Sequence, residues 1–220
     1  MTEPSIVEDP VDGASPPYFC ARCPRLYRFL SECRERLPEH FNGPVETFGD
    51  PEAALLVVGL APGINGANRT GRPFTGDYAG DLLYKALALH GFSNDRFAAR
   101  LDDGLALRRA MITNAVRCVP PQNKPVGAEV NSCRDYLLAQ IAGLPRLKVL
   151  LCLGKISHDS TVRALGGKVS REKFGHGSEY ELGGVTVLSS YHCSRYNTNT
   201  GRLTEAMFMD VFARAQALLA

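Results

Sequence analysis

Short apolar segments bounded by turn residues alternate along this chain with longer segments whose apolar residues recur at helical spacing. Apolar runs without a polar face are typical of strands buried on both sides, as in parallel sheets. Strands that alternate with helices form a parallel sheet with helices on both of its faces. The expected strands are residues 53–59, 110–116, 147–153 and 185–190, and the expected helices are residues 25–37, 78–89, 128–141, a segment after Gly154, and 203–219.

The length and composition fit a single globular domain. Of the 220 residues, 45% are apolar and 22% are charged, which is typical of soluble globular proteins. Residues 1–17 are acidic and rich in proline, so we expect a disordered tail followed by one domain over residues 18–220. The tail lacks an export signal, and no apolar run reaches the roughly 20 residues of a membrane span. We therefore expect a cytoplasmic protein.

Seven cysteines in such a chain favour a metal site over disulfide bonds. Cys20 and Cys23 form a Cys-x-x-Cys pair, and Cys118 and Cys133 form a second pair much later in the chain. Four thiolates in two pairs are typical both of zinc sites and of iron–sulfur clusters, and the spacing does not distinguish them. Either site would join the N-terminal segment to the loop after the second expected strand, which indicates a structural role.

Polar loops follow three of the four expected strands, after Gly59, Val116 and Ser190. Parallel sheets bind their ligands at the carboxyl ends of their strands. We therefore expect the functional site where these three loops converge.

The loop after the first expected strand combines glycines with one aromatic residue. The run Gly59-Leu60-Ala61-Pro62-Gly63 is followed by a polar stretch from Asn68 to Asp77 that contains Phe74. Glycines let the backbone approach a ligand closely. A phosphate-binding loop is the alternative, but neither a Walker motif nor G-x-G-x-x-G follows the strand.

Asn114 and His192 lie at the ends of two other expected strands. An asparagine in this position is more often structural, but its amide can both donate to and accept from the edge of a base. His192 opens a loop that also carries two arginines, a tyrosine and several amides, which favours a functional histidine over a structural one.

Together these motifs resemble the uracil-DNA glycosylase superfamily, in particular its family 5 (type b) branch. The resemblance covers roughly residues 20–212 and rests on Gly-Leu-Ala-Pro-Gly, Asn-Arg-Thr-Gly-Arg-Pro-Phe-Thr-Gly-Asp, Asn-Lys-Pro and Ser-Tyr-His-x-Ser-Arg-x-Asn-Thr-x-Thr-Gly-Arg. It implies an α/β fold, a three-layer α/β/α domain with a central four-stranded parallel sheet. It also implies a [4Fe–4S] cluster rather than zinc on Cys20, Cys23, Cys118 and Cys133.

The resemblance further implies a monofunctional DNA-repair enzyme that hydrolyses the N-glycosyl bond of uracil and leaves an abasic site. Its target nucleotide must leave the duplex and enter a pocket. By resemblance, the base stacks on Phe74, Asn114 reads its edge, and His192 donates a hydrogen bond to its carbonyl oxygen. The implied substrate-binding residues are Gly59, Leu60, Ala61, Pro62, Gly63, Asn68, Phe74 and Asn114.

The residue that activates water is where this chain departs from better-known branches. Those branches carry a polar residue in the first motif, as in Gly-Gln-Asp-Pro, whereas Leu60 and Ala61 are apolar. Asp77 is the next candidate, with Asn68 and Asn123 behind it, and Asp77 is equally suited to cap the helix expected near residue 78. Catalysis without a strong base would depend on the leaving group, which suggests hypoxanthine and other deaminated bases as further substrates.

The implied partner is uracil-containing DNA, double- or single-stranded, bound by a monomer at the nucleoid. Arg195, Tyr196 and Asn197 would enter the minor groove, and Arg195 and Arg202 would contact phosphates. A net charge of only +2 requires that the basic surface be local. Two rival hypotheses are an iron–sulfur module that binds nucleic acid without catalysis, and a zinc-containing nucleotide hydrolase, for which the expected carboxylate cluster is missing from the sequence.

Overall fold

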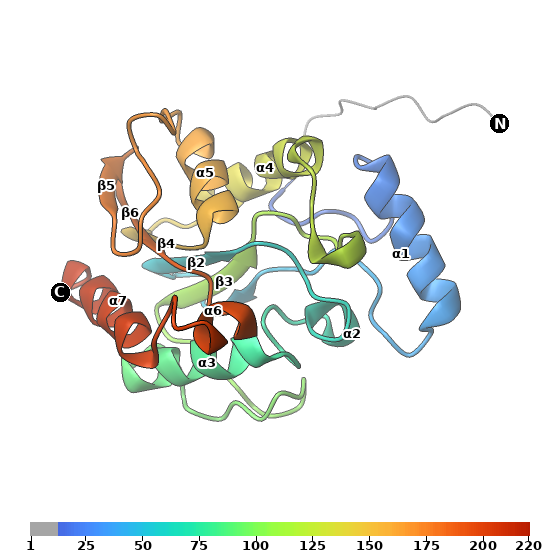
Figure 1. The fold of residues 1–220 in the computed structure, drawn as a ribbon, viewed down its shortest axis with the longest axis horizontal. Helices are drawn as coiled ribbons and strands as arrows, with labels where there is room; N and C mark the ends of the chain where they lie inside the picture. Colours follow the sequence, from blue (N-terminus) through green and yellow to red (C-terminus); the bar gives the residue numbers. More distant parts are fainter. Residues whose placement is uncertain (1–12) are drawn as a thin grey trace.

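The computed structural model describes residues 13–220, which form one mixed sheet between two layers of helices (Figure 1). The sheet has the strand order β1-β3-β2-β4-β6-β5. Its four inner strands run parallel to one another, and the two edge strands are antiparallel to their neighbours. The strands are β1 (Phe48–Gly49), β2 (Leu55–Gly59), β3 (Ala110–Asn114), β4 (Val149–Leu153), β5 (Glu179–Leu182) and β6 (Val185–Ser190).

The inner strands are buried at every position, as strands covered on both faces must be. On one face, α3 (Tyr78–Leu89) and α7 (Glu205–Leu218) pack against the sheet through Leu83, Phe208 and Phe212. On the other face, α4 (Gly127–Ala142) and α5 (Lys155–Ala164) cover it, and Leu137 of α4 joins the core there. The predicted parallel sheet with helices on both faces is confirmed.

The prediction of four strands missed the two edges. β1 has only two residues, too few to show a periodicity, and it pairs with β3 through Phe48 and Gly49. β5 reads Glu-Tyr-Glu-Leu with alternating exposure, which is typical of an edge strand with one solvated face. Both strands exist because the neighbouring strand offers unpaired backbone groups, and a local sequence pattern does not reveal that neighbour.

The long helices lie close to their expected positions, and α3 has the predicted bounds. α1 (Pro24–Arg36) stands beside the sheet and packs through Leu26 and Leu30 against Val116 and Val130. Three short helical segments interrupt loops that were expected to be irregular: α2 (Ala67–Thr70), the 3-10 turn η1 (Pro121–Asn123) and α6 (Arg195–Asn199). Within residues 13–220, no helix is both long enough and apolar enough to cross a membrane.

The parallel arrangement places the carboxyl ends of the inner strands at one edge of the sheet. Gly59 is in register with Asn114, and Leu153 is in register with Ser190. The loops after these residues therefore project from the same edge, where ligands of parallel sheets bind.

We predict that Phe212→Ala destabilises the protein by about 3–5 kcal/mol, the usual cost of removing a large aromatic side chain from a core. Phe212 is fully buried and packs edge-on against Phe208, with 5.2 Å between ring centroids. Urea unfolding followed by circular dichroism measures the change. Leu89→Ala is the matched control, because Leu89 is 66% exposed and its replacement should leave the unfolding midpoint almost unchanged.

Candidate active site

A cavity of about 750 Å³ opens at the carboxyl edge of the sheet. Its walls come from all of the loops that the sequence predicted to converge there. The loop after β2 contributes Leu60, Ala61 and Gly63, the segment after β3 contributes Asn123, and the segment after β6 contributes His192. The predicted convergence is therefore confirmed, since residues as far apart in the chain as Leu60 and Arg202 line one hollow.

His192 stands in the cavity as a neutral imidazole at physiological pH. Desolvation by burial lowers the pKa of its ring to about 4. Its carbonyl oxygen accepts a hydrogen bond of 2.9 Å from the Asn197 side chain, which anchors the loop that carries it. A neutral imidazole keeps one N–H donor, so His192 can donate a hydrogen bond without bringing a full positive charge into the cavity.

Phe74 faces His192 with 6.0 Å between the ring centroids and 25° between the ring planes. A base sandwiched between the two faces would need about 7 Å, twice the usual contact distance of carbon atoms. A base stacked on Phe74 would therefore meet His192 at its edge, where the carbonyl groups of a base lie.

Gly59 brings Phe74 and Asn114 together. A Cβ atom at Gly59 would lie 2.6 Å from the Phe74 ring and would also collide with Oδ1 of Asn114. Only glycine leaves room for both side chains against this backbone. Asn114 is buried, with 3% of its surface exposed. Neither Phe74 nor Asn114 is among the described residues that line the 750 Å³ cavity; both are buried next to its wall, where Phe74 faces the cavity-lining His192.

Asp77 caps α3, which confirms the capping alternative. Its Oδ1 accepts a hydrogen bond of 3.1 Å from the backbone N–H of Gly80. Its Oδ2 lies beside the backbone of Gly63 and Gly66, and the residue lines the cavity. Burial raises the pKa of the Asp77 carboxyl, and the hydrogen bonds from backbone N–H groups oppose that shift.

Other residues singled out in the sequence lie at different depths. Asn68 is completely buried and donates a 2.9 Å hydrogen bond from its amide to Oδ1 of Asn42, so it joins two loops and does not line the cavity. Pro62 is buried behind the wall formed by its neighbours. Asn123 is exposed at the cavity rim.

The segment around α6 forms the rim on the side of His192. Arg195, Asn197 and Arg202 line the cavity, and Tyr196 projects away from it with 72% of its surface exposed. The guanidinium of Arg195 lies 5.2 Å from the centroid of the Tyr78 ring, and that of Arg202 lies 4.7 Å from the Tyr191 ring. These contacts hold both arginines at the rim without neutralising their charge.

Sequence reasoning missed one wall of the cavity. The start of α5 lines it from Leu153 to Ser157, and Phe174 joins from the loop between α5 and β5. The signal for the first of these was available, because Gly154 follows β4, the third inner strand, at the same edge of the sheet. Phe174 carried no signal, since its loop has no periodicity and is held at the site by packing against Tyr191 and His158.

Cys20, Cys23, Cys118 and Cys133 line a second, small cavity beside α1. Burial raises the pKa of the Cys118 thiol and raises that of Cys133 to about 11. The backbone N–H of Arg117 points at the Cys133 sulfur, 3.4 Å away. No group of three or more His, Cys, Asp or Glu within residues 13–220 is arranged to hold a single metal ion.

Residues 1–12 of the predicted tail lie outside the described part of the chain. Of the rest of that segment, Pro16 is buried at the cysteine cavity, and the carbonyl oxygen of Ala14 accepts a hydrogen bond of 3.2 Å from Arg117.

Comparison with known proteins gives a consistent result. The family model described as "Uracil DNA glycosylase superfamily" matches residues 46–216. A type-5 uracil-DNA glycosylase of Thermus thermophilus is 43% identical over 206 residues, which cover 90% of this chain and 93% of that protein. A type-5 enzyme of Pyrobaculum aerophilum is 40% identical, with 90% and 88% covered, and a type-4 uracil-DNA glycosylase of the same organism is 32% identical, with 76% and 81% covered.

We predict that the His192 imidazole titrates near pH 4, well below an ordinary histidine at about 6.5. Between these two pH values the unfolded chain binds more protons than the folded one, so stability should fall as the pH drops from 6.5 towards 4. Nuclear magnetic resonance of the ring measures the pKa, and urea unfolding at pH 7 and pH 5 measures the linkage. His192→Gln should lose less stability over this range, and a ring pKa near 6.5 would contradict the prediction.

Proposed function

The chain belongs to the uracil DNA glycosylase superfamily, and from that premise we propose that it hydrolyses the N-glycosyl bond of uracil in DNA and leaves an abasic site. The observation that carries this proposal is the neutral imidazole of His192 facing Phe74 at the tips of the parallel strands. Such an enzyme is a base-excision repair hydrolase, and it acts at the nucleoid in the cytoplasm.

We place the everted base on the side of the cavity where His192 faces Phe74. A base must leave the duplex before an enzyme can reach its glycosidic bond. Stacking on an aromatic ring such as Phe74 is worth about 1–3 kcal/mol for any base. The Asn114 amide supplies one donor and one acceptor for the edge of uracil, and Gly59 leaves the space in which ring and amide meet.

His192 stabilises the leaving group. When the C–N bond breaks, its electron pair departs with the base and negative charge builds on the carbonyl oxygens. An N–H donor aimed at that oxygen in a dry site contributes roughly 10²–10³ in rate. A neutral donor with a pKa of about 4 is present across the physiological pH range, so this contribution does not titrate near pH 7.

Asp77 is our first candidate for positioning the attacking water. Its carboxylate lines the cavity and keeps Oδ2 beside the loop after β2 while Oδ1 caps α3. The water oxygen bonds to C1′ of the sugar, and Asp77 accepts the proton that is released. Asn123 at the rim is the second candidate, and the burial of Asn68 makes it a support for the loop instead.

The rim residues would hold the DNA backbone. Arg195 and Arg202 stand at the cavity edge for phosphate contacts, and exposed Tyr196 beside Asn197 is placed to enter the gap left by the everted base. Contacts to phosphates make binding weaken as salt rises. A monomer with one such rim would act on double- and single-stranded DNA.

The breadth of substrates follows from the size of the site. A cavity of about 750 Å³ with apolar walls at Leu60, Ala61 and Ile156 does not restrict entry to a pyrimidine. Leaving-group stabilisation by one donor also acts on any base with a suitably placed carbonyl. We therefore include hypoxanthine among the substrates.

The cysteine cavity fits a [4Fe–4S] cluster. Four thiols meet at this cavity, and four cysteine thiolates are the usual ligand set of such a cluster, which they would hold there. Arg117 gives a second reason, because it is only 1% exposed and its buried Nε has no hydrogen-bond partner. A buried cation needs a counter-charge, and four thiolates around a cluster supply one. The bound cluster would link the N-terminal segment to α4 covalently, away from the reacting base.

The proposed activity is tested with uracil- and hypoxanthine-containing oligonucleotides, in which alkaline cleavage reveals abasic sites. We expect His192→Ala to lower the single-turnover rate on uracil roughly 10²–10³-fold. His90→Ala, at the end of α3 and outside the cavity lining, serves as the control. Wild-type protein that produces no abasic sites would overturn the proposed function, and full activity of His192→Ala would overturn the role of the imidazole.

The pH profile tests the role of Asp77. Its raised pKa predicts that the excision rate falls as the pH drops through a value above that of an ordinary aspartate, because the protonated carboxyl no longer accepts a proton. Asp77→Asn keeps a good helix cap and should lower the rate while removing this limb of the profile. A variant that retains the limb would show that another group titrates.

The cluster is tested by iron and sulfide analysis of anaerobically purified protein, together with its visible absorbance. We expect four irons per chain in wild type and loss of both signals in Cys118→Ser. Cys152→Ala is the control, because Cys152 lies in the core of the sheet, apart from the cysteine cavity. Stoichiometric zinc in place of iron would contradict the proposal.

A further inference from the structure

Phe74 holds a backbone conformation that an aromatic residue rarely adopts. Its φ is +53°, in the left-handed region that disfavours side chains with a Cβ atom. Such a conformation persists only when surrounding contacts impose it. The contacts that set the direction of the Phe74 ring therefore involve the residues from Arg72 to Thr75.

Three contacts from α2 and α3 hold the backbone around Phe74. The hydroxyl of Tyr84 on α3 donates a hydrogen bond of 2.7 Å to the carbonyl oxygen of Pro73. The hydroxyl of Thr70 on α2 donates one of 3.1 Å to the carbonyl oxygen of Thr75. The carbonyl of Phe74 packs so closely on Gly80 that a Cβ atom there would collide with it.

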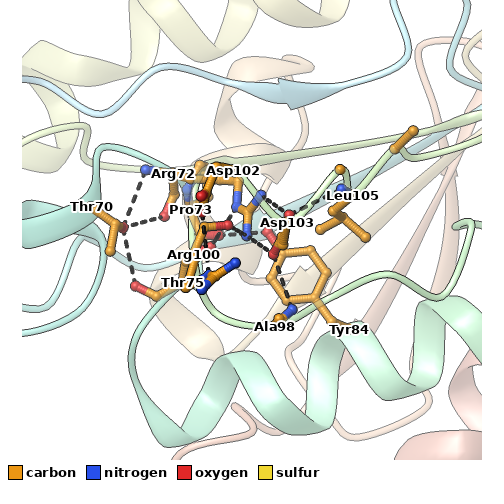
Figure 2. Close-up of polar contacts among 12 residues, drawn as sticks. Thr70, Arg72, Pro73, Thr75, Tyr84, Ala98, Arg100, Asp102, Asp103 and Leu105 are labelled. Atoms are coloured by element: carbon orange, nitrogen blue, oxygen red, sulfur yellow. Dashed lines mark hydrogen bonds and ion pairs between the residues drawn. The ribbon is translucent and has the colours of Figure 1, made fainter.

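Arg72 connects this turn to a distant loop (Figure 2). Its Nε donates to Oγ1 of Thr75 at 2.8 Å, and its two terminal nitrogens bind both oxygens of Asp103 at 2.9 and 2.7 Å. The side chain of Asp103 is completely buried and also accepts hydrogen bonds from the backbone N–H groups of Ala98 and Leu105. The Arg72 guanidinium thereby holds the pKa of the Asp103 carboxyl well below its usual range.

We infer that Asp103 is a positioning residue for the side of the cavity that receives the base. Through Arg72 and Thr75 it keeps Phe74 in its left-handed conformation, with the ring facing His192. This inference rests on the proposed glycosylase function. The bidentate contact is rigid because guanidinium and carboxylate are both planar and matched in shape. The Arg72–Asp103 pair is buried away from the lining of the 750 Å³ cavity, so neither group would touch the base. The loop between α3 and β3, which lines no part of the 750 Å³ cavity, thus gains a role in catalysis.

A double-mutant cycle separates this role from general stability. We expect Asp103→Asn to lower the single-turnover rate on uracil by about tenfold or more, since small displacements of positioned groups have such effects. In a Phe74→Ala background the same change should alter the rate less than about twofold, because the side chain that it positions is gone. Affinity for a duplex that already holds an abasic site should stay unchanged, as the rim contacts remain.

Asp102→Asn is the matched control. Asp102 is the neighbour of Asp103, pairs with Arg100 at the surface, and has 80% of its side chain exposed, so its replacement should leave both rate and affinity unchanged. If Asp103→Asn does not fold, Arg72→Lys goes through the same cycle, because it keeps the charge but loses the bidentate contact.

Three results are decisive. An equal loss of rate in both backgrounds would overturn the inference and assign Asp103 to general stability. A folded Asp103→Asn variant with the wild-type rate would also overturn it. Wild-type protein without any excision would instead overturn the proposed function. The free energy of unfolding, measured for each variant, shows whether a loss of rate comes from a loss of stability.

Discussion

The packing of the Phe74 ring on the bare backbone of Gly59 is the contact on which the geometry of the site depends. Gly59 ends β2 in register with Asn114 at the end of β3, so ring and amide meet over one peptide. Any side chain at Gly59 would push both away. The hydrogen-bond register of the sheet thus brings Phe74 and Asn114 together, and the contact between Arg72 and Asp103 braces the turn that carries the ring.

Burial then determines the charge states of the groups that line the cavity. Desolvation lowers the pKa of His192 and raises that of Asp77, so both groups shift towards their neutral forms. Two full positive charges stand at the rim, where Arg195 and Arg202 rest on aromatic rings. Under the proposed function, these charges would separate two tasks: attraction of an anionic backbone at the mouth, and chemistry on an uncharged base within.

The cysteine cavity shares packing contacts with one wall of the main cavity. Leu26 and Leu30 of α1 pack beside Cys118, and Ala61 and Ile64 of the loop after β2 pack against the same cluster. A cross-link that holds α1 in place would therefore also support one wall of the main cavity. In the proposed holoprotein, the cluster would thus support the cavity wall from outside the reacting site.

The inner strands and the long helices could be predicted from the sequence, because apolar runs and helical periodicity are properties of neighbouring residues. The meeting of the four cysteines and the convergence of the loops of Gly59 and His192 could be predicted as well. The sequence did not determine the edge strands, the wall from Leu153 to Phe174, the burial of Asn68, or the pairing of Arg72 with Asp103. Each of these depends on which surface a loop meets after the chain has folded. That choice is made by packing between segments far apart in the chain, and no local pattern records it.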